Sequence, residues 1–149
     1  MAPKDQPVVV EQVLIWPTDY AEPMRLRTLM LPNGASGTWI SAGDDELLFV
    51  LEGAVEFESA HAGKQALSSG SAAYVENGLE WKLRADQAST VFVFSIPAPV
   101  TPWGAALARE TGDSVATARL GAQESEVASS DRMFEVLFDA SRGCRGATM

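Results

Sequence analysis

Few side chains in this sequence belong to types that do chemistry by themselves. There is one histidine, His61, and one cysteine, Cys144. His61 lies in the polar stretch 59–64, which we interpret as a solvated loop. Cys144 has no histidine near it in sequence, whereas a catalytic thiol needs a positive environment or a base partner. Neither residue is predicted to be catalytic. The remaining candidate is the carboxylate of Glu46, which begins the buried-looking segment 46–52.

The elements that would position such groups are short strands. Up to about Ala98 the sequence shows roughly nine short apolar or alternating segments, separated by turn residues such as Pro32-Asn33-Gly34 and Asn77-Gly78. The pair Asp44-Asp45 is predicted to form a polar turn. In segment 54–58, Val55 and Phe57 alternate with glutamates, which is typical of a half-exposed strand. Short strands at spacings near ten residues predict an antiparallel sandwich or barrel.

Composition limits the classes of partner. Acidic residues outnumber basic ones by 20 to 11 over 149 residues, giving a formal charge of −9. Such a surface repels phosphate, so no nucleic-acid or membrane partner is expected. A single thiol cannot form an internal disulfide, the first seven residues do not resemble a signal peptide, and no apolar stretch approaches the roughly 20 residues that span a bilayer. We therefore expect a cytoplasmic protein.

Two glycine frameworks resemble the motifs of the cupin superfamily. In the first motif a glutamate is followed, after six residues, by a glycine, which fits Glu46 and Gly53, with Gly34 at the motif's start. The second motif begins at Gly70, has a glycine at the place of Gly78, and ends at Trp81. The resemblance covers residues 24–96 and implies an antiparallel cupin or jelly-roll β-barrel.

The resemblance also implies where metal ligands would stand, and this sequence departs from it there. The spacer between the second histidine of the first motif and Glu46 has three or four residues. With a spacer of three residues the two histidine positions of the first motif are Ile40 and Ala42. With a spacer of four they are Trp39 and Ser41. The histidine of the second motif is replaced by Trp81, so Glu46 alone survives of the four usual ligands. One carboxylate is far short of the three or four ligands that hold zinc, iron or manganese, so we expect no metal and no cofactor.

The same positions are the candidate ligand-binding residues: Trp39, Ser41, Glu46 and Trp81. Glu46 could serve as a general base, bind a polar ligand, or pair with a nearby arginine as a structural group, which we prefer. The two tryptophans could form a stacking platform for a planar ligand or fill the space of the missing metal. We expect a small-molecule binding or scaffold domain that is half of a two-domain cupin. The alternative is a metal-independent enzyme that uses Glu46 as acid or base on a small organic substrate.

The end of the chain raises a further alternative. Residues 1–98 are assigned to the barrel, 99–131 to a linker with one short helix near 103–110, and 132–149 to a strand and turn in a mostly irregular extension. The segment Arg132–Phe138 resembles Arg25–Leu31, so it could open a second cupin domain. It could instead be a final strand that pairs with a barrel edge or across a dimer, since cupins often dimerise by strand exchange and a homodimer is expected.

Overall fold

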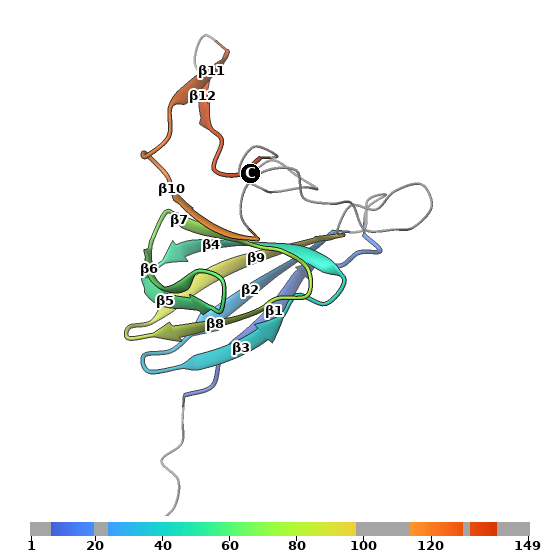
Figure 1. Cartoon of the computed structure of the whole chain (residues 1–149), viewed down its shortest axis with the longest axis vertical. Helices are drawn as coiled ribbons and strands as arrows, with labels where there is room; N and C mark the ends of the chain where they lie inside the picture. Colours follow the sequence, from blue (N-terminus) through green and yellow to red (C-terminus); the bar gives the residue numbers. More distant parts are fainter. Residues whose placement is uncertain (1–6, 20–23, 98–113, 130–131, 140–149) are drawn as a thin grey trace, which may run out of the picture.

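The computed structural model describes residues 7–19, 24–97, 114–129 and 132–139 (Figure 1). These residues form β-strands joined by turns, with no helix among them, and the strand pairs are antiparallel. The predicted all-β antiparallel fold is therefore confirmed. The strands are β1 (Val10–Ile15), β2 (Arg25–Leu31), β3 (Ser36–Ile40), β4 (Asp44–Glu52), β5 (Ala54–Ser59), β6 (Gly63–Ser68), β7 (Ser71–Val75), β8 (Glu80–Ala85), β9 (Ser89–Pro97), β10 (Val115–Arg119), β11 (Ser125–Ser129) and β12 (Arg132–Glu135).

Two sheets face each other and enclose the core. The larger sheet has the order β1-β2-β9-β4-β7-β10, and the smaller has the order β3-β8-β5-β6. Alternation along each strand sends one set of side chains inward, because successive residues of a strand point to opposite faces. In β8 the burial alternates through all six residues, with Trp81, Leu83 and Ala85 inside. The core between the sheets contains Leu29, Leu48, Val50, Phe57, Val75, Trp81, Leu83, Val91 and Val93.

The segment Asp44-Asp45 differs from its prediction. Both residues lie in β4 instead of a turn, and Asp45 is fully buried. Its carboxylate accepts hydrogen bonds from the hydroxyl of Tyr74 at 2.9 Å and from the backbone N–H of Asn77 at 2.9 Å. A buried carboxylate is tolerated when donors satisfy it, and these donors come from β7 and the loop after it, which local sequence does not reveal.

The C-terminal part adds strands where a linker was expected. Within residues 99–131, β10 pairs with β7 and extends the larger sheet. β11 and β12 form a hairpin that stands away from the two sheets (Figure 1). The predicted helix near 103–110 lies outside the described residues. The tail segment 132–138 is a strand only as far as Glu135, and it pairs with β11 instead of a barrel edge. Beyond it, Leu137 and Phe138 are buried against Leu47, Ala72 and Tyr74 on the outer face of the larger sheet.

Candidate functional site

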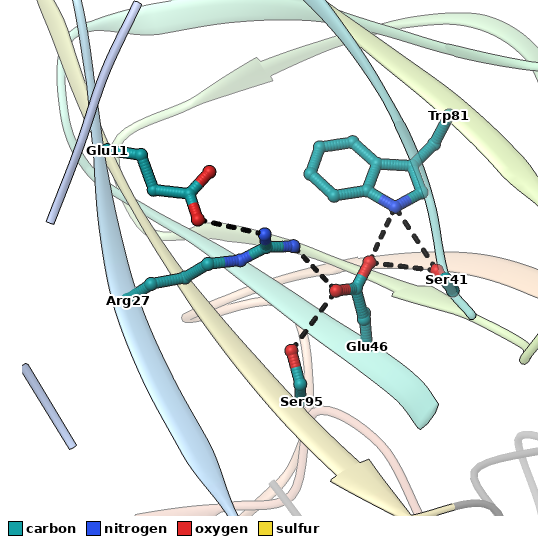
Figure 2. Close-up of polar contacts among 6 residues, drawn as sticks. All are labelled: Glu11, Arg27, Ser41, Glu46, Trp81 and Ser95. Atoms are coloured by element: carbon teal, nitrogen blue, oxygen red, sulfur yellow. Dashed lines mark hydrogen bonds and ion pairs between the residues drawn. The ribbon is translucent and has the colours of Figure 1, made fainter. Parts of the chain in front are cut away.

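The carboxylate of Glu46 lies at the centre of a buried polar cluster between the two sheets. β4 supplies Glu46, β2 supplies Arg27 and β9 supplies Ser95, all from the larger sheet. Trp81 comes from β8 of the smaller sheet, and Ser41 follows β3 directly. Figure 2 shows these five side chains converging, with Glu46 in the middle. We call this set the Glu46 cluster.

Both oxygens of the carboxylate are occupied by donors. Oε1 accepts from Nη2 of Arg27 at 2.6 Å and from Oγ of Ser95 at 3.1 Å. Oε2 accepts from Oγ of Ser41 at 2.8 Å and from Nε1 of Trp81 at 2.7 Å. An ionised carboxylate has about four lone-pair sites. The cluster therefore fills them, and no oxygen lone pair of Glu46 is left for a further partner.

The cluster is closed to solvent. Glu46 is 2% exposed and Trp81 is 0% exposed, and Ser41, Ser95 and Arg27 are buried too. Trp81, which replaces the histidine of the second motif in the sequence, is therefore buried in the core between the two sheets. A charge in such a position is costly unless it is paired and hydrogen-bonded, and the guanidinium of Arg27 meets that need. The structural interpretation of Glu46, as the partner of an arginine, agrees with this arrangement.

Arg27 connects the cluster to the edge of the sheet. Its Nη1 donates to Oε1 of Glu11 in β1 at 3.2 Å, while its Nη2 binds Glu46. One cation is thus shared by a buried and a half-exposed carboxylate. The sequence carries a signal for this residue that our prediction did not use. Arg27 stands on the same side of its strand as Leu29 and Leu31, which are buried, so its head group had to find a partner in the core. Ser95 carried no comparable signal.

Trp39 covers the cluster from the side of the smaller sheet. It pairs with Trp81 in register, and the two indoles stack with centroids 4.6 Å apart and planes 19° apart. Rings in direct contact leave no interval for a planar ligand between them, so a ligand could stack only on the other face of Trp39, which is partly exposed. Gly37 permits this arrangement, because a Cβ atom there would collide with the outer ring of Trp39.

The geometry decides between the two motif alignments. Ser41 is buried beside Glu46 and Trp39 lies against Trp81, whereas Ile40 is 62% exposed and Ala42 is exposed. The spacer is therefore four residues. All four candidate binding residues from the sequence, Trp39, Ser41, Glu46 and Trp81, are brought together in space.

The side chains of the cluster do not fit a metal ion. The ligand position of Trp81 presents an indole N–H, which donates and cannot coordinate, and Ser41 and Arg27 both donate to Glu46. Transition-metal sites need several lone-pair donors of histidine, cysteine or carboxylate type. Among the described residues there is no group of three or more His, Cys, Asp or Glu side chains arranged to hold a metal. Arg27 instead supplies the positive charge beside Glu46.

A second acidic residue lies next to the cluster. Burial raises the pKa of Asp44 above its usual value of 3.8, and the neighbouring carboxylates of Glu46 and Asp45 raise it further, while Arg25 and Arg27 oppose this shift. Asp44 is only partly buried.

Other candidate features lie away from the cluster. His61 is exposed, as predicted for a solvated loop residue. A hollow of about 430 Å³ lies on the outer face of the smaller sheet and includes Glu56, Glu58, Lys64, Lys82 and Arg84. Its charges are partly paired with each other, as Lys64 with Glu56 at 3.0 Å. None of the four predicted binding residues lines it. Cys144 lies outside the described residues.

Comparison with known proteins defines the class of fold. No protein-family model and no curated protein matches this sequence. The structure, however, is similar to solved cupin-fold structures, and the chain has a cupin-type fold. The described residues contain no helix able to cross a membrane.

Three solved structures illustrate the likeness. YlbA from E. coli has a TM-score of 0.63 at 15% identity, over 77% of this chain and 46% of that one. A cupin 2 conserved barrel domain protein from Leptotrichia buccalis has a TM-score of 0.51 at 11% identity, over 58% of this chain and 39% of that one. The cupin domain of an XRE family transcriptional regulator from Enterobacter cloacae has a TM-score of 0.52 at 16% identity, over 59% of this chain and 95% of that one. The chain thus spans less than half the length of the first two. At these identities the likeness concerns the fold alone.

Proposed function

We propose that this chain is a structural cupin module, in which a protein-only hydrogen-bond cluster takes the place of a metal centre. The observation that carries the proposal is the occupation of both Glu46 oxygens by four buried donors. A general base needs a free lone pair within reach of a substrate proton. Glu46 offers none without breaking contacts to Arg27, Ser95, Ser41 or Trp81. The alternative, a metal-independent enzyme with Glu46 as acid or base, is less well supported for that reason.

The module is further proposed to be one half of a two-domain cupin. Three features favour this. The match covers 77% of this chain but only 46% of YlbA, and residues 132–138 resemble Arg25–Leu31. A third feature is the outer face of the larger sheet, where Phe49, Phe94 and Ile96 are only partly covered and Leu137 and Phe138 already pack. A second barrel following this segment would find an apolar surface there. The cytoplasmic location and the lack of a nucleic-acid or membrane partner remain predictions.

Metal binding gives the direct test of the metal-free proposal. Elemental analysis of the purified chain, followed by calorimetric titration with Zn²⁺ and Ni²⁺, should reveal no stoichiometric site that depends on Glu46. As a positive control, the double substitution Ser41→His with Trp81→His places two imidazoles beside the carboxylate and should create measurable binding. Near one equivalent of metal in the unchanged protein, lost on Glu46→Gln, would refute the proposal.

Stability distinguishes the structural role from the enzymatic alternative. A structural Glu46 should make Glu46→Gln strongly destabilising, because the amide N–H₂ would face the donors of Arg27 or Trp81. A catalytic Glu46 would instead tolerate the near-isosteric change with little loss of stability, since active-site groups are commonly not optimised for stability. Urea unfolding of the two proteins measures the difference.

A further inference from the structure

The sequence contains two asparagines, Asn33 and Asn77, and each is followed by a glycine. In such a pair the backbone nitrogen of the glycine can attack the side-chain carbonyl carbon of the asparagine, because glycine has no side chain to obstruct the approach. The attack forms a C–N bond that closes a succinimide ring, and the side-chain amide leaves as ammonia. Water then opens the ring at either carbonyl, which leaves an aspartate or an isoaspartate. The two positions are therefore candidates for spontaneous deamidation.

The two Asn-Gly pairs stand in turns of the same form. Turn 32–35 is closed by a backbone hydrogen bond of 2.9 Å from its last residue to its first, and turn 76–79 by one of 3.3 Å. Both glycines have a positive φ, 81° at Gly34 and 86° at Gly78, as the third position of a type II turn requires. In each turn the glycine N–H, which supplies the attacking nitrogen, donates to a backbone carbonyl outside the turn. The attacking groups are therefore matched.

The side chain under attack differs between the two turns. Asn33 is exposed, and its carboxamide makes no hydrogen bond with the described residues. Asn77 is half-buried, and its Oδ1 accepts from the backbone N–H of Gly43 at 2.7 Å. The backbone N–H of Asn77 also donates to the carboxylate of Asp45 at 2.9 Å. Asn77 is thus held in one orientation, whereas the side chain of Asn33 is free to rotate toward the glycine that follows it.

From this difference we infer that Asn33 is a deamidation site of the folded protein and that Asn77 is protected by its contacts. The reacting atoms at Asn33 meet when the exposed turn opens, and such local openings cost little free energy. At Asn77 the same step also requires the loss of the hydrogen bond from Gly43. A contribution the size of one hydrogen bond corresponds to a factor of up to roughly ten in rate. The inference does not depend on the role proposed for Glu46.

A modification of turn 32–35 acts on the connection between the two sheets. The turn follows β2 of the larger sheet and precedes β3 of the smaller one. It is tied to the end of β8, because the N–H of Gly34 donates to the carbonyl of Ala85 at 2.7 Å and the N–H of Ala85 donates to the carbonyl of Ala35 at 2.9 Å. An isoaspartate inserts an extra carbon atom into the main chain, so these bonds lose their register. The change therefore loosens the start of β3, the strand that carries Trp39.

Peptide mapping of the aged full chain tests the site. Trypsin cleaves after lysine and arginine, so residues 28–64 carry Asn33 and residues 65–82 carry Asn77. The chain is incubated at mildly alkaline pH, and mass spectrometry of both peptides follows the conversion of amide to aspartate and isoaspartate. In the folded protein Asn33 should convert roughly tenfold faster than Asn77. In concentrated urea the two rates should become similar, because unfolding removes the contacts of Asn77 and leaves two Asn-Gly pairs.

Melting temperatures supply a second readout, with each aged protein compared with its own fresh sample. The unchanged chain should melt at a lower temperature once Asn33 has converted. Asn33→Gln should keep its melting temperature, because the longer side chain closes the ring far more slowly, and the matched variant Asn77→Gln should age like the unchanged chain. Three results would overturn the inference: an Asn33 that converts in urea but stays an amide in the folded protein, an Asn77 that converts as fast as Asn33 in the folded protein, or an aged Asn33→Gln protein that loses as much melting temperature as the unchanged chain.

Discussion

Trp81 donates its indole N–H to the carboxylate of Glu46 at 2.7 Å, across the gap between the two sheets. Trp81 belongs to the smaller sheet and Glu46 to the larger one. The contact therefore joins the two layers of the barrel by a charge-assisted hydrogen bond, which is stronger than a neutral one. The resemblance implies that metal-binding cupins have a metal-ligating histidine at the position of Trp81. In this chain the position holds a hydrogen-bond donor to Glu46 instead of a metal ligand.

Replacing Trp81 with alanine should destabilise the fold by roughly 3–5 kcal/mol, as large aromatic deletions in cores do. The loss combines an empty volume in the core with an Oε2 that has lost one donor. Denaturant unfolding monitored by circular dichroism measures it. The control is Trp16→Ala, at a 55% exposed site, for which a change within about 0.5 kcal/mol is expected. A loss below about 1 kcal/mol for Trp81→Ala would contradict its role in the core.

The ion pair of Arg27 and Glu46 should behave as a coupled unit. Arg27→Met leaves the carboxylate buried without its cation, and breaking a buried pair from one side costs about 3–5 kcal/mol. The double change Arg27→Met with Glu46→Gln should cost clearly less than the sum of the single changes, and a double-mutant cycle measures this coupling. Lys64→Met breaks an exposed pair with Glu56 and should cost at most about 1 kcal/mol. Additive effects at Arg27 and Glu46 would contradict the coupling.

Gly37→Ala should destabilise by about 1–3 kcal/mol, as overpacking does, because the new methyl group meets the ring of Trp39. Trp39 cannot simply turn away without losing its stack on Trp81. The second change Trp39→Leu should remove the collision, so Gly37→Ala should cost much less in that background. Thermal unfolding of the four proteins provides the comparison, and an equal cost in both backgrounds would show that the stack does not exclude the methyl group.

Phe138→Ala should lower stability by about 3–4 kcal/mol if the tail contributes to the folded unit, since Phe138 is fully buried against the outer face of the larger sheet. It lies near Tyr74, with ring centroids 6.3 Å apart. Phe92→Ala, which removes a partly buried ring from the same sheet, should cost less. A Phe138→Ala protein that unfolds at the same urea concentration as the original would show that the tail is independent of the barrel.

Asp44→Asn should raise stability slightly at neutral pH, by at most about 0.5 kcal/mol. Because burial raises the pKa of Asp44 above 3.8 in the folded state, the folded protein binds protons there more readily than the unfolded chain. Stability attributable to this group is therefore highest below about pH 3.8 and falls as the pH rises through the raised pKa. The advantage of Asp44→Asn should accordingly disappear in acid. A pH series of unfolding midpoints tests this, and an advantage that grows in acid would contradict it.

The sequence alone predicted roughly nine short strands up to about Ala98, and the structure has nine, β1 to β9, between Val10 and Pro97. Turn glycines and period-two alternation are local properties, so they can be recognised in the sequence. In β5, for example, Val55 and Phe57 alternate with Glu56 and Glu58. The spacing of Glu46, Gly53, Gly70 and Gly78 also singled out Glu46 and Trp81 as candidate site residues. Gly53 and Gly70 adopt positive φ of 81° and 83°. Glycine adopts this conformation without steric cost, so the sequence itself marks these turn positions.

Tertiary structure decided what the site is made of. The spacer of four residues, which selects Trp39 and Ser41 over Ile40 and Ala42, depends on how β3 enters the barrel. Arg27 and Ser95 join Glu46 only because β2, β9 and β4 are neighbours in the sheet, although they are far apart in the chain. Asp45 stays buried for the same kind of reason, since its donors arrive from β7 and the loop that follows it. Local patterns report which face of a strand is buried, but the partners of a buried charge are set by strand order, and strand order is a property of the whole chain.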